Sequence, residues 1–148
     1  MCGIAGLIHK GKTVNIGKEL QDMLQALKHR GPDSTGFALY SQGNNQGDYI
    51  MRFKVGENVA EGSTAVNEEK SVYDARRKEV DKHIRDLGGS IVNDAQLTPY
   101  SFRYCIKYDK DLMEFSKKIE SVEMTEILSL GKSLELVKDI GDASVVSK

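Results

Sequence analysis

The 148-residue chain is long enough for one compact domain with a hydrophobic core, and its 39% hydrophobic and 29% charged residues are ordinary globular usage. A formal net charge of −1 gives no electrostatic reason to expect nucleic acid or an anionic membrane surface as a partner. No apolar run approaches the roughly 18 residues of a membrane span, and no signal peptide is recognisable. Two cysteines are too few for a disulfide framework, so we expect a cytoplasmic protein.

The first part of the chain is predicted to contain a strand, a helix and a hairpin. Residues 3–8 are apolar and partly β-branched, which is typical of a buried strand. Apolar side chains at helical spacing predict a helix over residues 16–29, ended by a Gly-Pro pair. Residues 35–41 and 48–55 flank the sequence QGNNQG, and we expect them to pair as a hairpin around it.

The second part is predicted to hold a charged, solvated helix, a short strand, a half-buried strand, an amphipathic helix and two further strands around Gly131, with a helix as the alternative for the last of them. These elements cover residues 67–87, 90–93, 100–108, 109–122 and 125–141. The strict alternation of apolar and polar side chains over 100–108 is the clearest strand signal in the chain. Asp142 is predicted to cap a new helix. Because strands and helices mix without regular βαβ alternation, we expect an α+β fold with a largely antiparallel sheet.

The second residue, Cys2, is a candidate nucleophile. Cysteine is small enough for the initiator methionine to be trimmed, which would leave a thiol and a free α-amine on one residue. Such an amine has an ordinary pKa of about 7.7 to 8, so near neutral pH it can accept the thiol proton as a general base. The alternative is a small, buried and inert cysteine, and Cys2 alone does not decide between the two.

The sequence HRGPDSTG, residues 29–36, is the second candidate feature. Arg30 stands at the end of the predicted helix, where a cation complements the helix dipole. If the Gly-Pro turn directs Arg30 and Asp33 toward the chain terminus, the guanidinium can hold the terminal residue or a carboxylate substrate. The alternative is a capped helix followed by an Asx turn.

The remaining candidates indicate structure rather than chemistry. The three histidines have no cysteine or carboxylate partner at metal-ligand spacing, so we expect no metal site. Cys105, on the polar side of its strand, is expected to be structural. The mixed charges of residues 74–86 are expected on a solvated helix face, and the aromatic stripe of residues 100–108 in the core.

The blocks MCGIAG and HRGPDSTGFALY, in this order and at this distance, resemble the class II glutamine amidotransferases, which use an N-terminal cysteine. The segment SLGKSLELVKDIGD and the long insert from about residue 57 to residue 125 are similar to glutaminase domains of the glutamate synthase type. The resemblance implies that residues 1–148 are the N-terminal part of one such domain. It also implies part of the N-terminal nucleophile hydrolase sandwich, two largely antiparallel sheets between helix layers.

The resemblance implies a role for each matching residue. Cys2 would attack the side-chain amide of glutamine to form a γ-glutamyl thioester, with its own amine as the base. Arg30 and Gly31 would help to form the wall around the terminal residue, and Asp33 would hold the turn. The implied partner is a synthetase or glutamate synthase-like subunit, or the missing C-terminal half, which receives the ammonia. No cofactor is implied in this chain.

The family also uses an HTR block that grips the glutamine carboxylate, an Asn-Gly pair that stabilises the oxyanion, and an aspartate downstream of them for the ammonium. Neither HTR nor Asn-Gly occurs in this sequence, so the downstream aspartate has no counterpart placed by them. Asn44 and Asn45 are better explained as a hairpin tip. Loss of one oxyanion donor alone costs about 100- to 1,000-fold in rate.

We therefore expect a chain that is inactive alone, whether as a fragment, as a subunit completed by another polypeptide, or as an inactive remnant. A retained Met1 would also block the Cys2 amine. The alternative function is a non-catalytic or regulatory module that binds a synthetase subunit.

Overall fold

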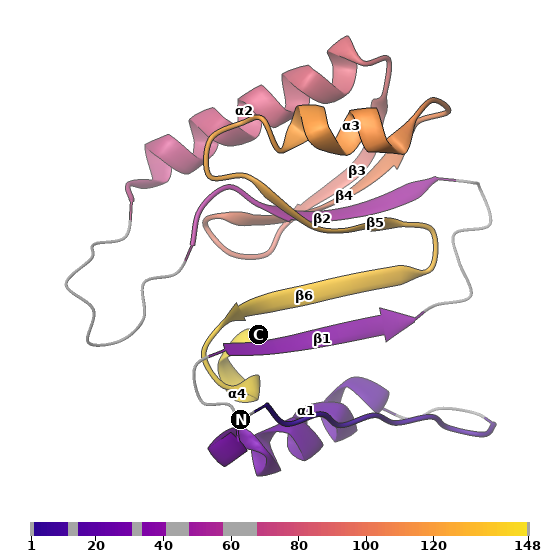
Figure 1. Ribbon diagram of the computed structural model, residues 1–148, viewed down its shortest axis with the longest axis vertical. Coiled ribbons are helices and arrows are strands. Elements are labelled where there is room, and N and C mark those ends of the chain that lie inside the picture. The colour runs from indigo at the N-terminus through magenta and orange to yellow at the C-terminus, as the bar shows by residue number, and fades with distance from the viewer. Residues whose placement is uncertain (1, 12–14, 31–33, 41–47, 58–67, 148) are drawn as a thin grey trace. The chain divides into compact units, whose positions relative to one another are not determined.

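The computed structural model describes residues 2–11, 15–30, 34–40, 48–57 and 68–147. The fold is α+β, with two antiparallel sheets and helices beside them (Figure 1). The chain divides into two compact units, and each is described by itself. The first holds the described residues up to Phe37 and from Lys138 onward, and the second holds those from Ala38 to Val137. None of the helices within these ranges is long and apolar enough to cross a membrane.

The second unit is built on a four-stranded sheet in the order β3-β4-β2-β5. Its strands are β2 (Tyr49–Lys54), β3 (Ser90–Gln96), β4 (Ser101–Lys107) and β5 (Glu126–Gly131). All neighbours are antiparallel, and β2 pairs with β4 on one side and with β5 on the other. The strands alternate their side chains between the two faces of this sheet, so each face has its own composition.

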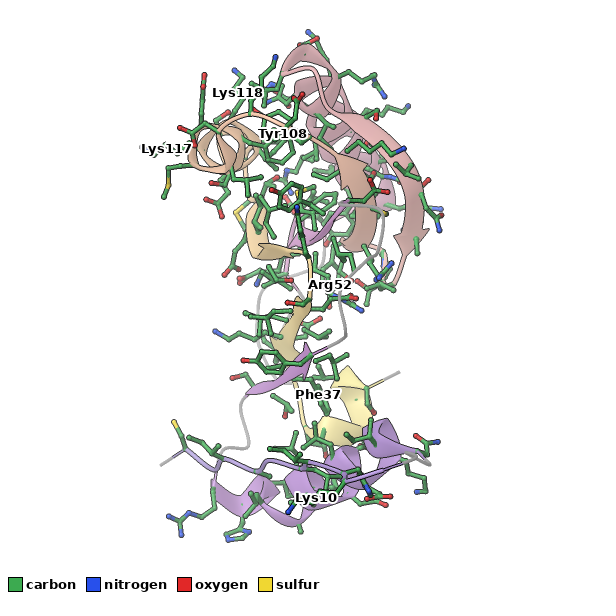
Figure 2. All side chains as sticks on the ribbon, turned by 90° about the vertical axis from the view of Figure 1, so that its right-hand side faces the viewer. Lys10, Phe37, Arg52, Tyr108, Lys117 and Lys118 are labelled. Carbon is green, nitrogen blue, oxygen red and sulfur yellow. The ribbon has the colours of Figure 1, made fainter. Side chains whose placement is uncertain are left out.

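One face of the sheet is apolar and is covered by α2 (Lys70–Asp86) and α3 (Leu112–Ile119). The fully buried side chains of this core are Met51, Phe53, Val55, Val80, Ile84, Phe102, Tyr104, Ile106, Phe115 and Ile119. The rings of Phe53 and Tyr104 meet edge to face, with centroids 4.9 Å apart. Figure 2 shows Lys117 and Lys118 projecting from α3 on its exposed side. Each of the two helices thus packs its apolar side on the sheet and turns its charged side to solvent.

Two arginines of α2 pack toward the sheet, so the prediction that the charges of residues 74–86 lie on a solvated helix face is wrong in part. Arg76 is only 8% exposed and donates to the carbonyl of Val55 at 3.0 Å and to the Glu68 carboxylate. The guanidinium of Arg77 lies 4.8 Å from the ring centroid of Phe102. Its Nε donates to the hydroxyl of Tyr104. Long charged side chains can cover apolar surface when their heads find partners, which alternating charge in a sequence does not reveal.

The Tyr104 hydroxyl joins this arrangement to a second residue of α2. It donates to Asp81 at 2.7 Å and accepts from Arg77 at 2.8 Å. Burial, reinforced by the bond to Asp81, raises the pKa of Tyr104 well above its ordinary value of 10. The phenol therefore stays protonated and acts as a hydrogen-bonded link between helix and sheet.

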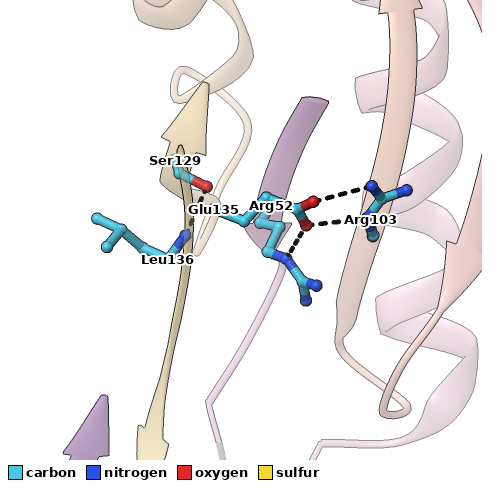
Figure 3. Close-up of polar contacts among 5 residues, drawn as sticks. All are labelled: Arg52, Arg103, Ser129, Glu135 and Leu136. Carbon is cyan, nitrogen blue, oxygen red and sulfur yellow. Dashed lines mark hydrogen bonds and ion pairs between the residues drawn. The ribbon is translucent and has the colours of Figure 1, made fainter. Parts of the chain in front are cut away.

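The other face of the sheet carries a charged cluster formed by Arg52, Arg103 and Glu135, which we call the arginine–glutamate cluster. Arg52 and Arg103 are register partners on β2 and β4, so their side chains emerge side by side. Glu135, on β6 (Leu134–Ile140), accepts from Arg52 Nε at 2.6 Å and from Arg103 at 2.8 and 2.9 Å (Figure 3). The bonds from Arg103, and those from Arg52, hold the pKa of Glu135 below its ordinary value. One carboxylate therefore compensates two cations that face each other.

The first unit is built around α1 (Ile16–Ala26), whose N-cap Asn15 accepts from the backbone of Lys18. The short 3₁₀ helix η1 (Lys28–Arg30) follows it. The predicted helix over 16–29 is thus confirmed, with a tighter final turn. Near the other end of the chain Asp142 caps α4 (Ala143–Val146), as predicted.

Two side-chain contacts join distant parts of the chain within the first unit. The amide of Gln25 in α1 donates to the Asp142 carboxylate at 3.2 Å. The hydroxyl of Thr35 donates to the carbonyl of Gly141 at 2.8 Å. Gly141 has a φ of +119°, a backbone conformation that glycine adopts at little cost. Thr35, which belongs to the motif HRGPDSTG, therefore lies beside Gly141.

Two predictions for the first part of the chain are wrong. Residues 3–8 are not the buried strand expected, because no described strand pairs with them and their side chains are exposed or half-buried. The strand β1 (Ser34–Tyr40) does not form a hairpin with β2. It pairs with β6 in a two-stranded sheet, because β4 and β5 already occupy both edges of β2. The proposed hairpin tip QGNNQG and the Gly-Pro helix stop lie outside the described residues.

The other predicted elements are confirmed. The helices predicted over 67–87 and 109–122 are α2 and α3, and the strands predicted over 90–93 and 100–108 are β3 and β4. The last two predicted strands are β5 and β6, with the turn beginning after Gly131. The elements that were predicted from local periodicity are therefore present in the structure.

Candidate functional site

The N-terminal segment runs along α1 in the opposite direction to the helix (Figure 1). At its start, a Cβ placed on Gly3 would lie 3.2 Å from the Cβ of Arg30 and 3.3 Å from that of Leu27. At its end, His9 Nε2 lies 2.8 Å from the Glu19 carboxylate, near the first turn of α1. These two contacts fix the direction of the segment and place its first residues at the C-terminal end of α1.

Cys2 therefore stands beside the 3₁₀ helix that carries Arg30. Its thiol is free and exposed. The same helix contributes Lys28 and His29, so this end of the first unit is rich in basic side chains. A basic surrounding favours a substrate that carries a carboxylate. The arrangement combines an accessible thiol with several basic side chains.

The structure brings together two of the four predicted site residues. Cys2 and Arg30 are close because Gly3 packs directly on the end of the helix. Any side chain at position 3 would crowd Leu27 and Arg30, so this glycine serves the packing of the segment on the helix end. Gly31 and Asp33 lie outside the described residues.

Sequence reasoning did not single out Thr35 or Gln25 as residues that shape this unit. Thr35 belongs to the HRGPDSTG block, and its bond to Gly141 ties that block to the end of β6. Gln25 also accepts a bond from the backbone of Ser144 at 3.3 Å. The available signal was that HRGPDSTG and SLGKSLELVKDIGD resemble blocks of the same family.

The second cysteine is in a different environment. Cys105 lies on the charged face of the sheet but is 9% exposed, and its thiol donates to the buried Asp48 carboxylate at 3.8 Å. Its placement fits the expected structural role, although burial replaces the expected polar exposure. No group of three histidine, cysteine or acidic residues within the described ranges could hold a metal ion.

Alkylation is expected to distinguish the two thiols. Iodoacetamide should modify Cys2 at least about tenfold faster than Cys105 in the folded chain, because burial keeps the reagent from the second thiol. Peptide mass mapping over time measures both rates. In urea the two rates should converge, and faster modification of Cys105 in the folded state would contradict the described exposure.

Comparison with known proteins gives two similar proteins. The protein named "Putative glutamine amidotransferase" from Methanothermobacter thermautotrophicus is 32% identical over 143 residues, which are 95% of this chain and 44% of that protein. The protein named "Putative asparagine synthetase [glutamine-hydrolyzing] 2" from Methanocaldococcus jannaschii is 51% identical over 41 residues, which are 28% of this chain and 8% of that protein. The chain thus spans less than half the length of these curated relatives.

No protein-family model matches the chain, and no solved structure matches it significantly. The similarity to the first relative nevertheless extends over almost the whole chain. The names of both relatives agree with the resemblance carried by the two N-terminal blocks. Sequence similarity and motifs together support a relationship to the glutamine amidotransferases.

Proposed function

We propose that this chain carries the nucleophile of a class II glutamine amidotransferase of the glutamate synthase type. The observation that carries the proposal is the position of Cys2, exposed at the second residue and held beside Arg30 by the packing of Gly3. The names of the relatives, one of which includes glutamine hydrolysis, support glutamine as the substrate. The proposed reaction is the hydrolysis of glutamine to glutamate and ammonia.

The proposed mechanism begins once Met1 has been removed. The free amine of Cys2 takes the thiol proton, and the thiolate attacks the side-chain carbonyl carbon of glutamine. The same amine returns the proton to the amide nitrogen, the C–N bond breaks, and ammonia leaves a γ-glutamyl thioester. Water then adds to the thioester and gives one proton back to the sulfur. Glutamate leaves, and the free cysteine is restored.

Arg30, Gly31 and Asp33 are proposed to shape the site rather than to react. Arg30 emerges from the helix on which Gly3 packs, so its guanidinium can hold the terminal residue or a substrate carboxylate. Gly31 would let the backbone approach the terminal residue, and Asp33 would hold the turn between η1 and β1. The oxyanion donors and the glutamine clamp would come from polypeptide outside these 148 residues.

The freed ammonia is proposed to pass to a synthetase-type partner. The second relative is named as a glutamine-hydrolysing asparagine synthetase, a protein whose name joins both activities. For this chain, the proposed acceptor of the ammonia is a glutamate synthase-like subunit or domain. A module of this kind needs no cofactor of its own for glutamine hydrolysis.

A glutamine-analogue electrophile tests the proposal directly. The protein produced from its own gene, with any polypeptide that stays bound to it, is treated with the analogue and examined by intact mass. We expect the initiator methionine to be absent and a single adduct to map to Cys2. Iodoacetamide provides the control, because it modifies an exposed thiol whether or not the site recognises glutamine.

Retained methionine and no reaction with the analogue, with iodoacetamide still reacting at Cys2, would contradict the proposal. That result would favour the non-catalytic module that binds a synthetase subunit. A single mass measurement therefore distinguishes glutamine hydrolysis from a non-catalytic binding role.

A further inference from the structure

We infer that Gln25 and Asp142 are positioning residues for glutamine hydrolysis, because together they hold the end of α1 on which Gly3 packs and beside which Cys2 stands. All four residues belong to the first unit. The inference rests on the proposed function, since a positioning residue needs a reaction to serve, but the position of the helix end can be measured without that reaction. It also gives a role to residues 129–142, SLGKSLELVKDIGD, which the proposed chemistry does not use.

The side-chain amide of Gln25 uses both of its ends. Its Nε2 donates to Oδ2 of Asp142 at 3.2 Å, and its Oε1 accepts from the backbone N–H of Ser144 at 3.3 Å. An amide that donates to one residue and accepts from a near neighbour has only one favourable orientation, since turning it over would oppose donor to donor. The half-buried Gln25 therefore fixes the last turn of α1 against the start of α4.

Asp142 divides its two carboxylate oxygens between the two helices. Oδ1 accepts from the backbone of Ser144 at 3.0 Å, from its hydroxyl at 2.6 Å and from the backbone of Val145 at 3.3 Å. Oδ2 is thereby left to accept from Gln25. Ala143, between the two polar residues of α4's start, is only 1% exposed. The carboxylate is thus held by its own helix and presents one oxygen to α1.

The held end of α1 is also the end nearest to Cys2. Leu27, two residues after Gln25, caps α1 and accepts from the backbone N–H of Arg30 at 2.8 Å. A Cβ on Gly3 would lie 3.3 Å from the Cβ of Leu27, so the backbone before it packs closely on this end. A displacement of the helix end would therefore displace Cys2, and an error of about 1 Å in the position of a reacting group can cost on the order of 100-fold in rate.

Thr35 supports the chain on the other side of the same motif. Its hydroxyl donates to the carbonyl of Gly141 at 2.8 Å. Gly141 has a φ of +119°, and a Cβ there would lie 3.1 Å from Cγ1 of Val145, so a larger residue would disturb this contact. Thr35 and Gln25, one after Arg30 and one before it, thus bond to the short segment 141–144.

A reversal of the Gln25–Asp142 hydrogen bond tests the inference, in the protein produced from its own gene with any bound polypeptide. Gln25→Glu opposes two carboxylates and should lower kcat at least about 30-fold with KM changed less than about threefold, because the thiol is displaced rather than the groups that bind glutamine. In Gln25→Glu with Asp142→Asn, the amide at position 142 donates to the carboxylate at position 25 and still caps α4. We expect kcat to return to within about threefold of the unchanged protein.

Two single variants complete the series. Asp142→Asn alone opposes two amide donors and should lower kcat about tenfold, so the double variant should be more active than this single variant even if Gln25→Glu alone does not fold. Asp22→Asn, which removes the exposed pair of Asp22 with Lys18 on the same helix, is the matched control and should leave kcat unchanged. A double variant no more active than Asp142→Asn would overturn the inference.

Hydrogen exchange measures the helix end without glutamine. The amide of Arg30 should exchange at least about tenfold faster in Asp142→Asn and recover in the double variant. Unchanged exchange would overturn the inference, and so would faster exchange with unchanged kcat in a protein whose hydrolysis needs Cys2. Hydrolysis that does not need Cys2 would contradict the proposed function, and the Arg30 amide would then still decide whether Gln25 and Asp142 hold the helix end.

Discussion

Replacing Cys2 with alanine is expected to lower kcat for glutamine hydrolysis by more than about 1,000-fold, because the variant lacks the atom that forms the thioester. The measurement is the release of glutamate and ammonia by the protein produced from its own gene, with its bound partners. Cys2 is exposed, so the substitution leaves the core intact and the thermal midpoint should stay the same.

Two controls test whether the loss of activity is specific to the Cys2 thiol and its free amine. Cys105→Ala, at the buried thiol of β4, should retain glutamine hydrolysis, since Cys105 belongs to the sheet of the second unit. A form that keeps Met1 should be as inactive as Cys2→Ala, because its Cys2 nitrogen is an amide and cannot accept the proton. Turnover that survives Cys2→Ala would contradict the proposed mechanism.

The second large effect is expected at the arginine–glutamate cluster. Glu135→Gln should lower the free energy of unfolding by about 3 kcal/mol, because it removes the one carboxylate between two facing guanidinium groups. The side chains of Arg52 and Glu135 are 13% and 14% exposed, so water cannot replace the lost charge. Urea unfolding of the chain measures the change, and the midpoint should fall by about 1–2 M.

Glu126→Gln is the matched control for this substitution. Glu126 also pairs with a lysine of β2, Lys54, but its side chain is 52% exposed. Pairs of this kind contribute about 0–1 kcal/mol. An equal loss of stability in Glu126→Gln and Glu135→Gln would contradict the expectation that burial makes the loss of the Glu135 charge more costly.

The same cluster makes stability depend on pH. Hydrogen bonds from Arg103 and Arg52 lower the pKa of Glu135 in the folded chain below its ordinary value of 4.5. The unfolded chain therefore binds more protons, so this contribution is fully present above pH 4.5 and is lost as pH falls through the folded-state pKa. Glu135→Gln should show a shallower loss of stability in acid than the unchanged chain. An identical acid profile would contradict this assignment.

The sequence predicted most helices and strands because their signals are local. The strand over 100–108 alternates in residue type, and the helices over 67–87 and 109–122 repeat apolar residues at helical spacing. The asparagine before α1 and Asp142 before α4 cap their helices through their own neighbours. Such features need no knowledge of the rest of the chain.

Pairing between strands could not be predicted in the same way. Proximity in the sequence favoured a hairpin between β1 and β2, but β2 found its partners in β4 and β5. Arg52 and Arg103 occupied polar positions of predicted strands and gave no sign that a carboxylate of β6 lies between them. Contacts over such separations depend on the topology of the sheet, which local periodicity does not encode.

The candidate site was predicted in part. The two N-terminal blocks suggested that Cys2 and Arg30 belong together, and the packing of Gly3 on the end of η1 agrees with this. Their catalytic roles stay predictions until Cys2→Ala is measured. The greater exposure of Ile4 than of Leu7 could not be predicted from an apolar run, because such a run does not show which residues face the helix.

The central place of β2 in its sheet also has a consequence for the order in which the chain is synthesised. β2 leaves the ribosome before both of its neighbours, β4 and β5, exist. At about 5–20 residues per second, it waits on the order of several seconds with both edges open. Meanwhile β3 and β4, which follow each other directly, can pair as soon as they emerge. Within the four-stranded sheet, β2 is therefore the strand that stays unpaired for longest, and early release would leave it as the most aggregation-prone strand of that sheet.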